Sequence, residues 1–193
     1  GENFTRLSAK SLHDQGNGQL KIFNEYGPTE CTVGCIVHEY NPQVDTNSAN
    51  VPIGTAMQDC APFIADTNGV PLPDGAVGEL CLTGIGLSTG YLNDPELTKE
   101  KYITSHPIIK YRYYRSGDLA RINDRGIIEY LGRRDAQIKV RGIRIETGEI
   151  ENVIESSSKI LSCVVTQKQR SQTVETDYIH CSKCGLPSNY PTA

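Results

Sequence analysis

A threonine hydroxyl and a glutamate carboxylate stand side by side at Thr29 and Glu30, directly after the chain-breaking pair Gly27-Pro28. The short apolar run at 21–23 predicts a strand that ends at this pair. Mg²⁺ prefers oxygen ligands and keeps few protein carboxylates, so one Glu beside a phosphate-contacting Thr is sufficient for a metal-bound phosphate. An ordinary turn that carries an exposed acid is the alternative interpretation.

A second concentration of polar residues extends from 114 to 151. Asp118 follows Ser116-Gly117, a turn-forming pair, and is therefore expected at the edge of a loop. Residues 120–130 predict a hairpin that turns at the polar segment 123–126. The segment 132–142 then surrounds a single acid, Asp135, with Arg133, Arg134, Lys139 and Arg141. Such a segment suits an anionic ligand or a moving interface, and a solvated charged strand is the alternative.

The cysteines fall into two groups. Cys181 and Cys184 form a Cys-x-x-Cys-Gly pattern, which in zinc ribbons presents two thiolates to one tetrahedral ion. One such pair is half a zinc site, and a redox pair or two unliganded thiols are the alternatives. The remaining cysteines stand singly in apolar contexts, which predicts reduced, buried thiols at Cys31, Cys35, Cys60, Cys81 and Cys163.

Composition limits the class of protein. The chain has 193 residues, 37% of them hydrophobic, and a formal net charge of -4. These values predict a globular protein without the basic field that attracts nucleic acid or an anionic membrane. No apolar run approaches the roughly 18 residues that span a bilayer, and the first residues lack the apolar core of a secretory signal. A cytoplasmic location is expected.

The elements that must position these side chains follow from the hydrophobic pattern. A helix is expected at 6–12. Residues 51–102 predict short strands between regularly spaced turns, which is typical of a small antiparallel β-barrel. Farther along, a strand or hairpin is expected at 137–145, an amphipathic helix at 147–155 and a strand at 160–166.

Several motifs, in the same order, resemble those of adenylate-forming enzymes, and more narrowly the amino-acid adenylation domains of nonribosomal peptide synthetases. They are Asn-Glu-Tyr-Gly-Pro-Thr-Glu at 24–30, Gly-Glu-Leu at 78–80, Gly-Tyr-Leu-Asn-Asp-Pro at 90–95, Tyr-Arg-Ser-Gly-Asp at 114–118, Gly-Arg-Arg-Asp-Ala-Gln-Ile-Lys-Val-Arg-Gly at 132–142 and Glu-Thr-Gly-Glu-Ile-Glu at 146–151. Agreement of several motifs is far more specific than one short pattern.

The resemblance implies a role for individual residues. It places Gly1, Glu2, Asn24 and Tyr26 at the nucleotide, with Thr29 on its phosphates and Glu30 on Mg²⁺. It implies that Asp118 accepts hydrogen bonds from the ribose hydroxyls and that Tyr130 and Arg133 flank the ribose. Asp135 becomes the hinge of a rotating lid, and Lys139 belongs to the lid face used in the second half-reaction. Glu25, Val33 and Gly34 fall in the amino-acid pocket.

The implied fold is α/β with a large β component, divided into three parts. Residues 1–134 are expected to be the end of the large subdomain with its distorted antiparallel barrel, 135–167 a partial α+β lid, and 168–193 a divergent tail. A phosphate loop ending in Pro-Lys-Gly and the family's terminal catalytic lysine do not occur in the sequence. The chain is therefore expected to be a fragment that is inactive by itself.

The implied reaction joins ATP to an amino acid and transfers the product to the phosphopantetheine thiol of a carrier protein. ATP and Mg²⁺ are the expected cofactors, with Zn²⁺ at the tail as a further possibility for the intact protein. The expected partners are the amino acid, the carrier protein and the rest of a multidomain synthetase. Two alternatives stay open: a fragment of an acyl-CoA or aryl-CoA ligase, and a degenerate adenylation domain that serves as a nucleotide-binding scaffold.

Overall fold

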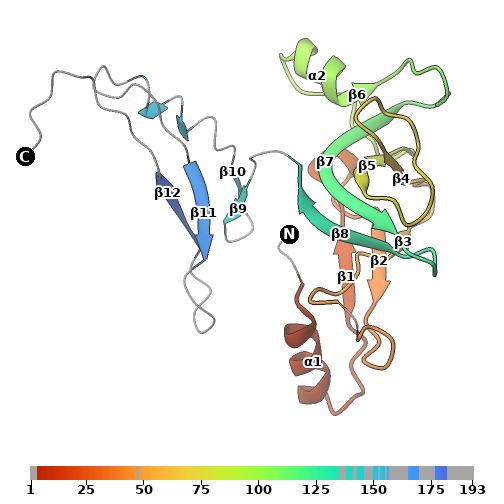
Figure 1. The fold of residues 1–193 in the computed structure, drawn as a ribbon, viewed down its shortest axis with the longest axis vertical. Coiled ribbons are helices and arrows are strands. Elements are labelled where there is room, and N and C mark those ends of the chain that lie inside the picture. The colour runs from red at the N-terminus through yellow and green to blue at the C-terminus, as the bar shows by residue number, and fades with distance from the viewer. Residues whose placement is uncertain are drawn as a thin grey trace, which may run out of the picture. The chain divides into compact units, whose positions relative to one another are not determined.

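The structure is a computed structural model that describes residues 4–46 and 48–134, together with the short segments 138–140, 143–145, 150–151, 153–154, 156, 165–169 and 177–181. The chain divides into two compact units, Asn3–Arg134 and a second that takes in Asp135–Ala193 (Figure 1). This boundary coincides with the one proposed from the sequence. The assignment of the second unit as a lid stays a prediction.

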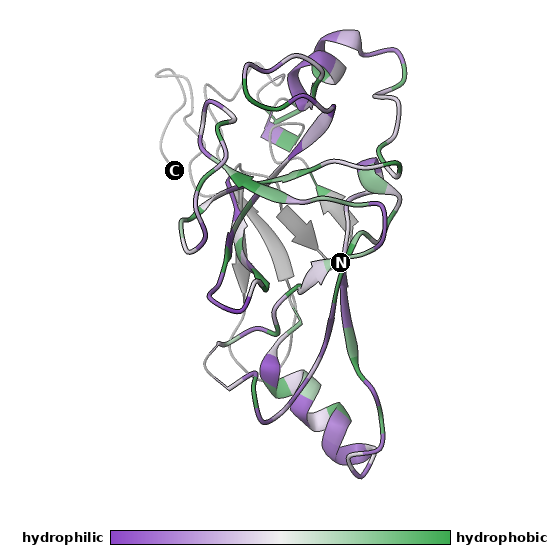
Figure 2. Cartoon of the chain, turned by 90° about the vertical axis from the view of Figure 1, so that its right-hand side faces the viewer, coloured by the Kyte–Doolittle hydropathy of each residue, from purple (hydrophilic) through white to green (hydrophobic). Residues whose placement is uncertain are grey.

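The first unit begins with the helix α1, Arg6–Gln15, which confirms the helix expected at 6–12 and extends it. Thr5 caps the helix because its side chain accepts a hydrogen bond from the Ser8 amide, as N-cap residues do. Ala9 is the buried residue of α1, and in Figure 2 this lowest helix is largely hydrophilic. The helix therefore attaches to the unit through a narrow apolar stripe.

A three-stranded antiparallel sheet follows, in the order β1-β2-β3. Its strands are β1 Phe23–Tyr26, β2 Ile36–Glu39 and β3 Thr55–Ala56. The strand expected to start at 21 begins two residues later and ends, as expected, before Gly27-Pro28. A short 3-10 helix, Thr29–Cys31, lies in the connection between β1 and β2, so Thr29 and Glu30 stand at the end of a paired strand.

A second antiparallel sheet has five strands, in the order β4-β5-β7-β6, with β8 also paired to β7. The strands are β4 Phe63–Ala65, β5 Gly78–Leu82, β6 Tyr102–Ile103, β7 Tyr113–Ile122 and β8 Ile128–Arg133. Helix α2, Pro95–Lys101, precedes β6 and is capped by Asp94. Curled antiparallel sheets with few helices confirm the expected fold class, and β7 with β8 confirms the hairpin expected at 120–130.

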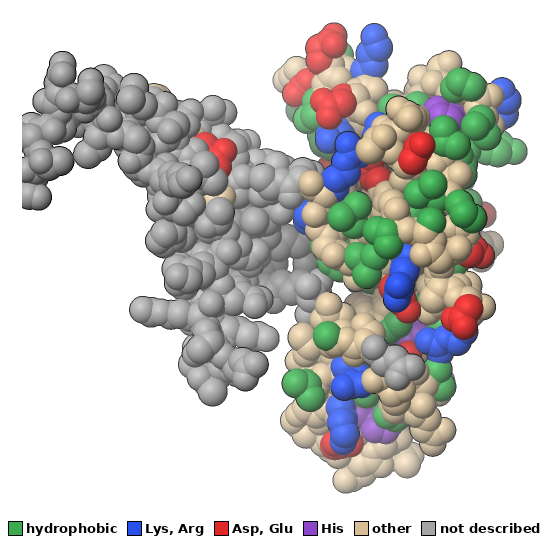
Figure 3. Space-filling view, in the orientation of Figure 1, with side chains coloured by type: hydrophobic (Ala, Val, Ile, Leu, Met, Phe, Trp, Pro, Cys, Tyr) green, Lys and Arg blue, Asp and Glu red, His purple; other side chains and the backbone are tan. Residues whose placement is uncertain are grey.

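One apolar core joins the two sheets. Gly54, next to β3, forms a bridge with Ile128 at the start of β8. Residues of both sheets pack in the same cluster, among them Ile36, Leu80, Leu82 and Tyr114. Lys and Arg side chains on the face drawn in Figure 3 are scattered among side chains of other types.

Asp118 does not lie at the edge of a loop, and this expectation was wrong. It lies inside β7. Glu79 of β5 pairs with Leu119 of β7, and Cys81 pairs with Arg115, so the three β7 residues 116–118 lie opposite the single β5 residue Leu80. Gly117 adopts a φ of 73° in this segment, a conformation that glycine takes without a steric penalty. The sequence Ser-Gly-Asp therefore makes a β-bulge, which re-aims a side chain within a strand.

The described segments of the second unit form two antiparallel pairs: β9 Ile138–Val140 with β10 Ile143–Ile145, and β11 Val165–Gln169 with β12 Asp177–Cys181. The first pair confirms the hairpin expected at 137–145, and residues 150, 151, 153 and 154 are helical as expected. The boundary between lid and tail that was expected at 167/168 falls within β11. The strands of this unit therefore give no boundary at that position. No helix in the described segments has the length and apolar character needed to cross a membrane.

Candidate functional site

The carboxylate of Asp118 lies at the centre of a polar cluster built from three strands. The Tyr26 hydroxyl of β1 donates a hydrogen bond to its Oδ2 atom. The Arg133 guanidinium of β8 donates to Oδ1 at 2.9 Å and to the Ser116 carbonyl oxygen at 2.7 Å. Asp118 is only 4% exposed, so its negative charge is stabilised by a cation and a hydroxyl rather than by solvent.

The bulge of β7 is held by its own hydrogen bonds. The Ser116 hydroxyl donates to the Leu80 carbonyl oxygen at 2.6 Å and accepts from the Asp118 amide at 3.0 Å. The Gly117 amide donates to Oε1 of Glu79 at 3.1 Å. These bonds replace ladder bonds that the bulge interrupts, and they fix the direction of Asp118.

Glu79 on β5 is a second buried carboxylate beside the bulge, 5% exposed. Its Oε2 atom accepts from Arg115 at 2.6 and 3.0 Å and from Nη1 of Arg134 at 2.9 Å. Arg134 is the last residue of the first unit, and its amide also donates to the Gly117 carbonyl oxygen at 2.8 Å. Glu79 therefore anchors the segment that leads out of β8.

Two tyrosines complete the cluster around Asp118. The rings of Tyr26 and Tyr130 lie with centroids 6.4 Å apart. Burial, and then the adjacent charge of Asp118, raise the pKa of Tyr26 well above its usual value. The phenol therefore keeps its proton and acts as a donor to the carboxylate at all physiological pH values.

Thr29 and Glu30 occupy different environments although they are neighbours. Thr29 is exposed, whereas Glu30 is 6% exposed and its Oε1 atom accepts a hydrogen bond from the Tyr91 hydroxyl at 2.7 Å. A carboxylate next to an exposed hydroxyl provides hard oxygen donors, so the residue types fit Mg²⁺ bound to a phosphate.

The residues expected near the substrate lie on β1 and at the β1–β2 connection. Nδ2 of Asn24 donates to the carbonyl oxygens of Val51 at 3.1 Å and Pro52 at 2.9 Å. This uses both amide hydrogens, so only Oδ1 of Asn24 remains to contact a ligand. A Cβ atom added at Gly34 would lie 1.7 Å from Oε1 of Glu25, so these two expected pocket residues are immediate neighbours.

The structure thus brings together Tyr26, Asp118, Tyr130 and Arg133 in one cluster. Val33 lies 73% exposed beside Gly34. Gly1, Glu2, Asp135 and Cys184 lie outside the described residues, and Lys139 and Cys181 lie on β9 and β12, where only the backbone is described.

Three residues with clear roles were not singled out from the sequence: Glu79, Tyr91 and Ser116. Each lies inside one of the quoted motifs. For Glu79 a signal was available in the sequence, because it is an acid at a strand position where the alternation predicts burial. A buried acid needs a cationic partner, so this position indicates an ion pair. The hydrogen-bond partners of Tyr91 and Glu79 are distant in the sequence, so the neighbouring residues could not identify those partners.

Several known proteins are similar to this chain over most of its length. The model of the family described as AMP-binding enzyme matches residues 1–92. Tyrocidine synthase 3 of Brevibacillus parabrevis is 42% identical over 165 residues, which are 86% of this chain and 2% of that protein. Zwittermicin A synthase ZmaJ of Bacillus cereus is 43% identical over 158 residues, 82% of this chain and 29% of that protein.

Among solved structures, the adenylation domain AlmE of Vibrio cholerae, in complex with glycyl-adenosine-5'-phosphate, superposes with a TM-score of 0.79 at 30% identity, over 95% of this chain and 35% of that one. The chain belongs to the adenylate-forming superfamily and resembles the adenylation domains of nonribosomal peptide synthetases. It spans less than a third of these two curated relatives and about a third of the solved domain.

Proposed function

We propose that the Asp118 cluster is the ribose-binding part of an ATP site in a protein that adenylates an amino acid. The observation that carries this proposal is a buried carboxylate fixed by a bulge and flanked by an aromatic ring and a guanidinium. Such a group recognises a diol, because each carboxylate oxygen accepts more than one hydrogen bond. Tyr26 uses one acceptor position on Oδ2 and Arg133 uses one on Oδ1, and each oxygen has a further acceptor position.

Access to Asp118 requires a local rearrangement. The carboxylate is 4% exposed, so a ribose reaches it only after a group that is hydrogen-bonded to Asp118 shifts. Tyr26 is the better candidate, because a neutral hydroxyl is replaced by a ribose hydroxyl without loss of charge compensation. Arg133 then stays with the carboxylate and flanks the sugar, while the Tyr26 ring remains as an apolar surface beside the nucleotide.

The same proposal assigns the remaining residues. Thr29 contacts the phosphates, Glu30 contributes a ligand to Mg²⁺, and Asn24 presents Oδ1 to the adenine. Gly1 and Glu2 lie at the nucleotide, Asp135 is the hinge of the lid, and Lys139 lies on the lid face used after rotation. When bound, Mg²⁺ neutralises charge on the phosphates, and the protein's own groups position the reactants.

The substrate and partners follow from the same assignment. Glu25, Val33 and Gly34 line one wall of the pocket for an amino acid, whose carboxylate displaces pyrophosphate from ATP. The aminoacyl-adenylate is then attacked by the phosphopantetheine thiol of a carrier protein, and AMP leaves. The relatives named as tyrocidine and zwittermicin A synthases support this context, as does PA1221, a solved nonribosomal peptide synthetase protein with adenylation and carrier domains. A cytoplasmic location and a half zinc site at Cys181 and Cys184 belong to the same proposal.

Nucleotide binding by the full chain tests the role of Asp118. The chain is titrated with ATP and with a dideoxyribose analogue of ATP by isothermal calorimetry. ATP is expected to bind at least about tenfold more tightly, and Asp118→Asn is expected to abolish this preference. Glu129→Gln, which alters a carboxylate away from the cluster, serves as the control. Equal affinity for the two nucleotides in the unaltered chain contradicts the proposal.

Catalysis is a separate question from binding. Pyrophosphate exchange with a panel of amino acids is expected to show no turnover by the isolated 193-residue chain, since the sequence contains no Pro-Lys-Gly phosphate loop and no family-type terminal lysine. Turnover by the isolated chain overturns the expectation of inactivity. The role of Asp118 in ribose binding is tested separately, by the titrations with ATP and its dideoxyribose analogue.

A further inference from the structure

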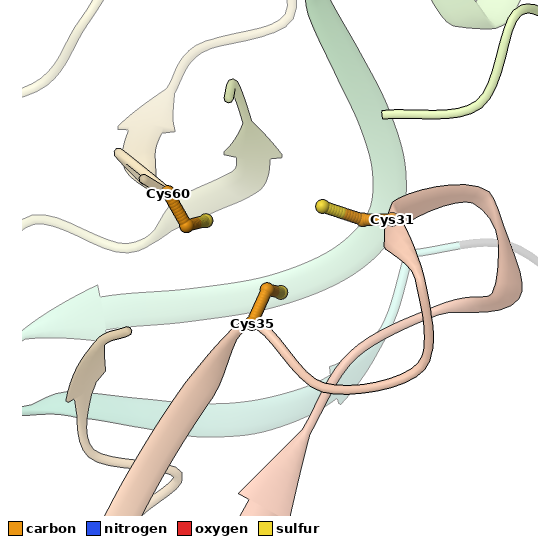
Figure 4. A group of neighbouring side chains, drawn as sticks. All are labelled: Cys31, Cys35 and Cys60. Carbon is orange, nitrogen blue, oxygen red and sulfur yellow. The ribbon is translucent and has the colours of Figure 1, made fainter. Parts of the chain in front are cut away.

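Three cysteines that stand apart in the sequence converge in the core of the first unit. The Sγ atoms of Cys31, Cys35 and Cys60 all lie within 4.8 Å of one another. The prediction of reduced, buried thiols is confirmed for Cys31 and Cys35, whereas Cys60 is a free thiol that is only partly buried. Figure 4 shows the three side chains directed toward a common space between the ribbons.

The three thiols come from three different segments. Cys31 ends the 3-10 helix, Cys35 directly precedes β2, and Cys60 lies between β3 and β4, where it forms an isolated bridge with Gly84. Cys31 and Cys35 are 2% and 3% exposed and belong to the main core, against which the partly buried Cys60 packs. The group is thus anchored by the fold, with one member within reach of solvent.

The backbone between Cys31 and Cys35 adopts a demanding conformation. Thr32 and Val33 have φ values of 54° and 65°, and β-branched residues rarely take positive φ. The Gly34 amide donates to the Thr32 carbonyl oxygen at 2.8 Å, which closes a tight turn around Val33. This turn allows two cysteines only four residues apart to present their sulfurs to the same space.

We propose that Cys31, Cys35 and Cys60 form a binding site for a thiophilic divalent cation, for which Zn²⁺ is the physiological candidate. Soft thiolate ligands select such ions. Two sulfurs on a tetrahedral Zn²⁺ with bonds of about 2.3 Å stand about 3.8 Å apart, so side-chain shifts of about one ångström complete the site. Coordination converts three thiols to thiolates and releases three protons to solvent.

The site provides three ligands and leaves a fourth position for water or an external ligand. Among the described residues, no fourth Cys, His, Asp or Glu joins the group. Cys60 is the most accessible of the three thiols. Three ordinary core thiols, which pack as small apolar groups, are the competing explanation. The proposal does not rest on the proposed nucleotide site.

Cobalt spectroscopy on the reduced full chain distinguishes these explanations. Because Cys181 and Cys184 are themselves a predicted half-site, the test uses a Cys181→Ser/Cys184→Ser background. One equivalent of Co²⁺ is expected to produce an intense thiolate-to-cobalt charge-transfer band, which Zn²⁺ then abolishes. Adding Cys60→Ser is expected to weaken Co²⁺ binding by at least about tenfold. Cys81→Ser removes a buried thiol outside the group and is expected to leave binding unchanged.

Folding is monitored in the same variants. Zn²⁺ is expected to raise the melting temperature of the background chain by mass action and to raise that of the Cys60→Ser chain by less. Circular dichroism confirms that each variant is folded, and Cys60→Ala provides a second variant if the serine hydroxyl destabilises the core. Absence of the band in the folded background chain, or its persistence at equal affinity in folded Cys60 variants, overturns the proposal.

Discussion

Asp118 and Glu79 are two buried carboxylates on neighbouring strands, and they are held in different ways. Glu79 accepts hydrogen bonds from two arginines and from the Gly117 amide. Asp118 accepts from one arginine and from a neutral tyrosine. The first set occupies the carboxylate with rigid partners, whereas the second includes a hydroxyl that a ligand hydroxyl can replace. We infer that Glu79 fixes the fold and that Asp118 serves the ligand.

The largest effect is expected from Glu79→Gln. Gln keeps one acceptor oxygen, but the negative charge shared by Arg115 and Arg134 is lost, and one of the two oxygens that hold the arginines and the Gly117 amide becomes an amide donor. We expect the free energy of unfolding to fall by about 3 kcal/mol, measured by urea denaturation. A decrease of less than about 1 kcal/mol in the free energy of unfolding would contradict the inference that Glu79 fixes the fold.

Asp118→Asn is expected to be less destabilising, by about 1–2 kcal/mol. The side chain keeps its shape and one acceptor oxygen, but the charge that compensates Arg133 is lost. The preference for ATP over its dideoxyribose analogue should disappear in the same variant. The inference is contradicted if Asp118→Asn lowers the free energy of unfolding more than Glu79→Gln does and the preference for ATP remains. Asp118 would then fix the fold and would not serve the ligand.

Tyr26→Phe separates the hydroxyl from the ring. We expect a loss of about 1 kcal/mol in unfolding free energy, because a buried hydrogen bond to Asp118 is removed. Nucleotide affinity should be equal or higher, since the ribose no longer displaces the Tyr26 hydroxyl. Calorimetry with ATP measures this, and Tyr113→Phe, in a separate core cluster, is the matched control. Weaker ATP binding would show that the hydroxyl itself contacts the nucleotide.

Glu129→Gln is expected to have the smallest effect. Burial alone would raise the pKa of Glu129, but hydrogen bonds from Asn123 and Arg121 hold it below its usual value. A lowered folded pKa contributes stability above the unfolded pKa, and this contribution is lost as pH falls through the folded pKa. We expect Glu129→Gln to cost less than about 1 kcal/mol near neutral pH and nothing in strong acid. Urea unfolding across this pH range measures the difference, and a cost that persists in acid contradicts it.

Local patterns were sufficient for much of the fold. The alternation and turn residues around 123–126 predict the β7–β8 hairpin, because Asn123 and Gly126 satisfy a turn by themselves: the Asn123 side chain accepts from the Arg125 and Ile127 amides. The same local logic failed at Ser116-Gly117, which resembles a turn but forms a bulge. There the partner strand β5 determines the conformation, because the Ser116 hydroxyl donates a hydrogen bond to the Leu80 carbonyl oxygen and the Gly117 amide donates one to the Glu79 carboxylate.

The candidate site shows the same division. The motifs identified Tyr26, Asp118, Tyr130 and Arg133, and the structure brings these four together. Glu79 and Tyr91 were not singled out, because their importance lies in partners 36 and 61 residues away. Local sequence can indicate that such a side chain is buried, as it does for Glu79, but it does not identify the distant partner.

The sequence by itself determined the family, the order of the motifs and the residue types that suit a nucleotide and its metal. Only the tertiary structure decided that Asp118 lies buried in a strand and that Cys31, Cys35 and Cys60 meet in one place. The physical reason is that burial and convergence depend on which strands pair and how the chain turns between them. Residue types and spacing specify what a side chain is able to do, and long-range packing determines which other side chains it meets.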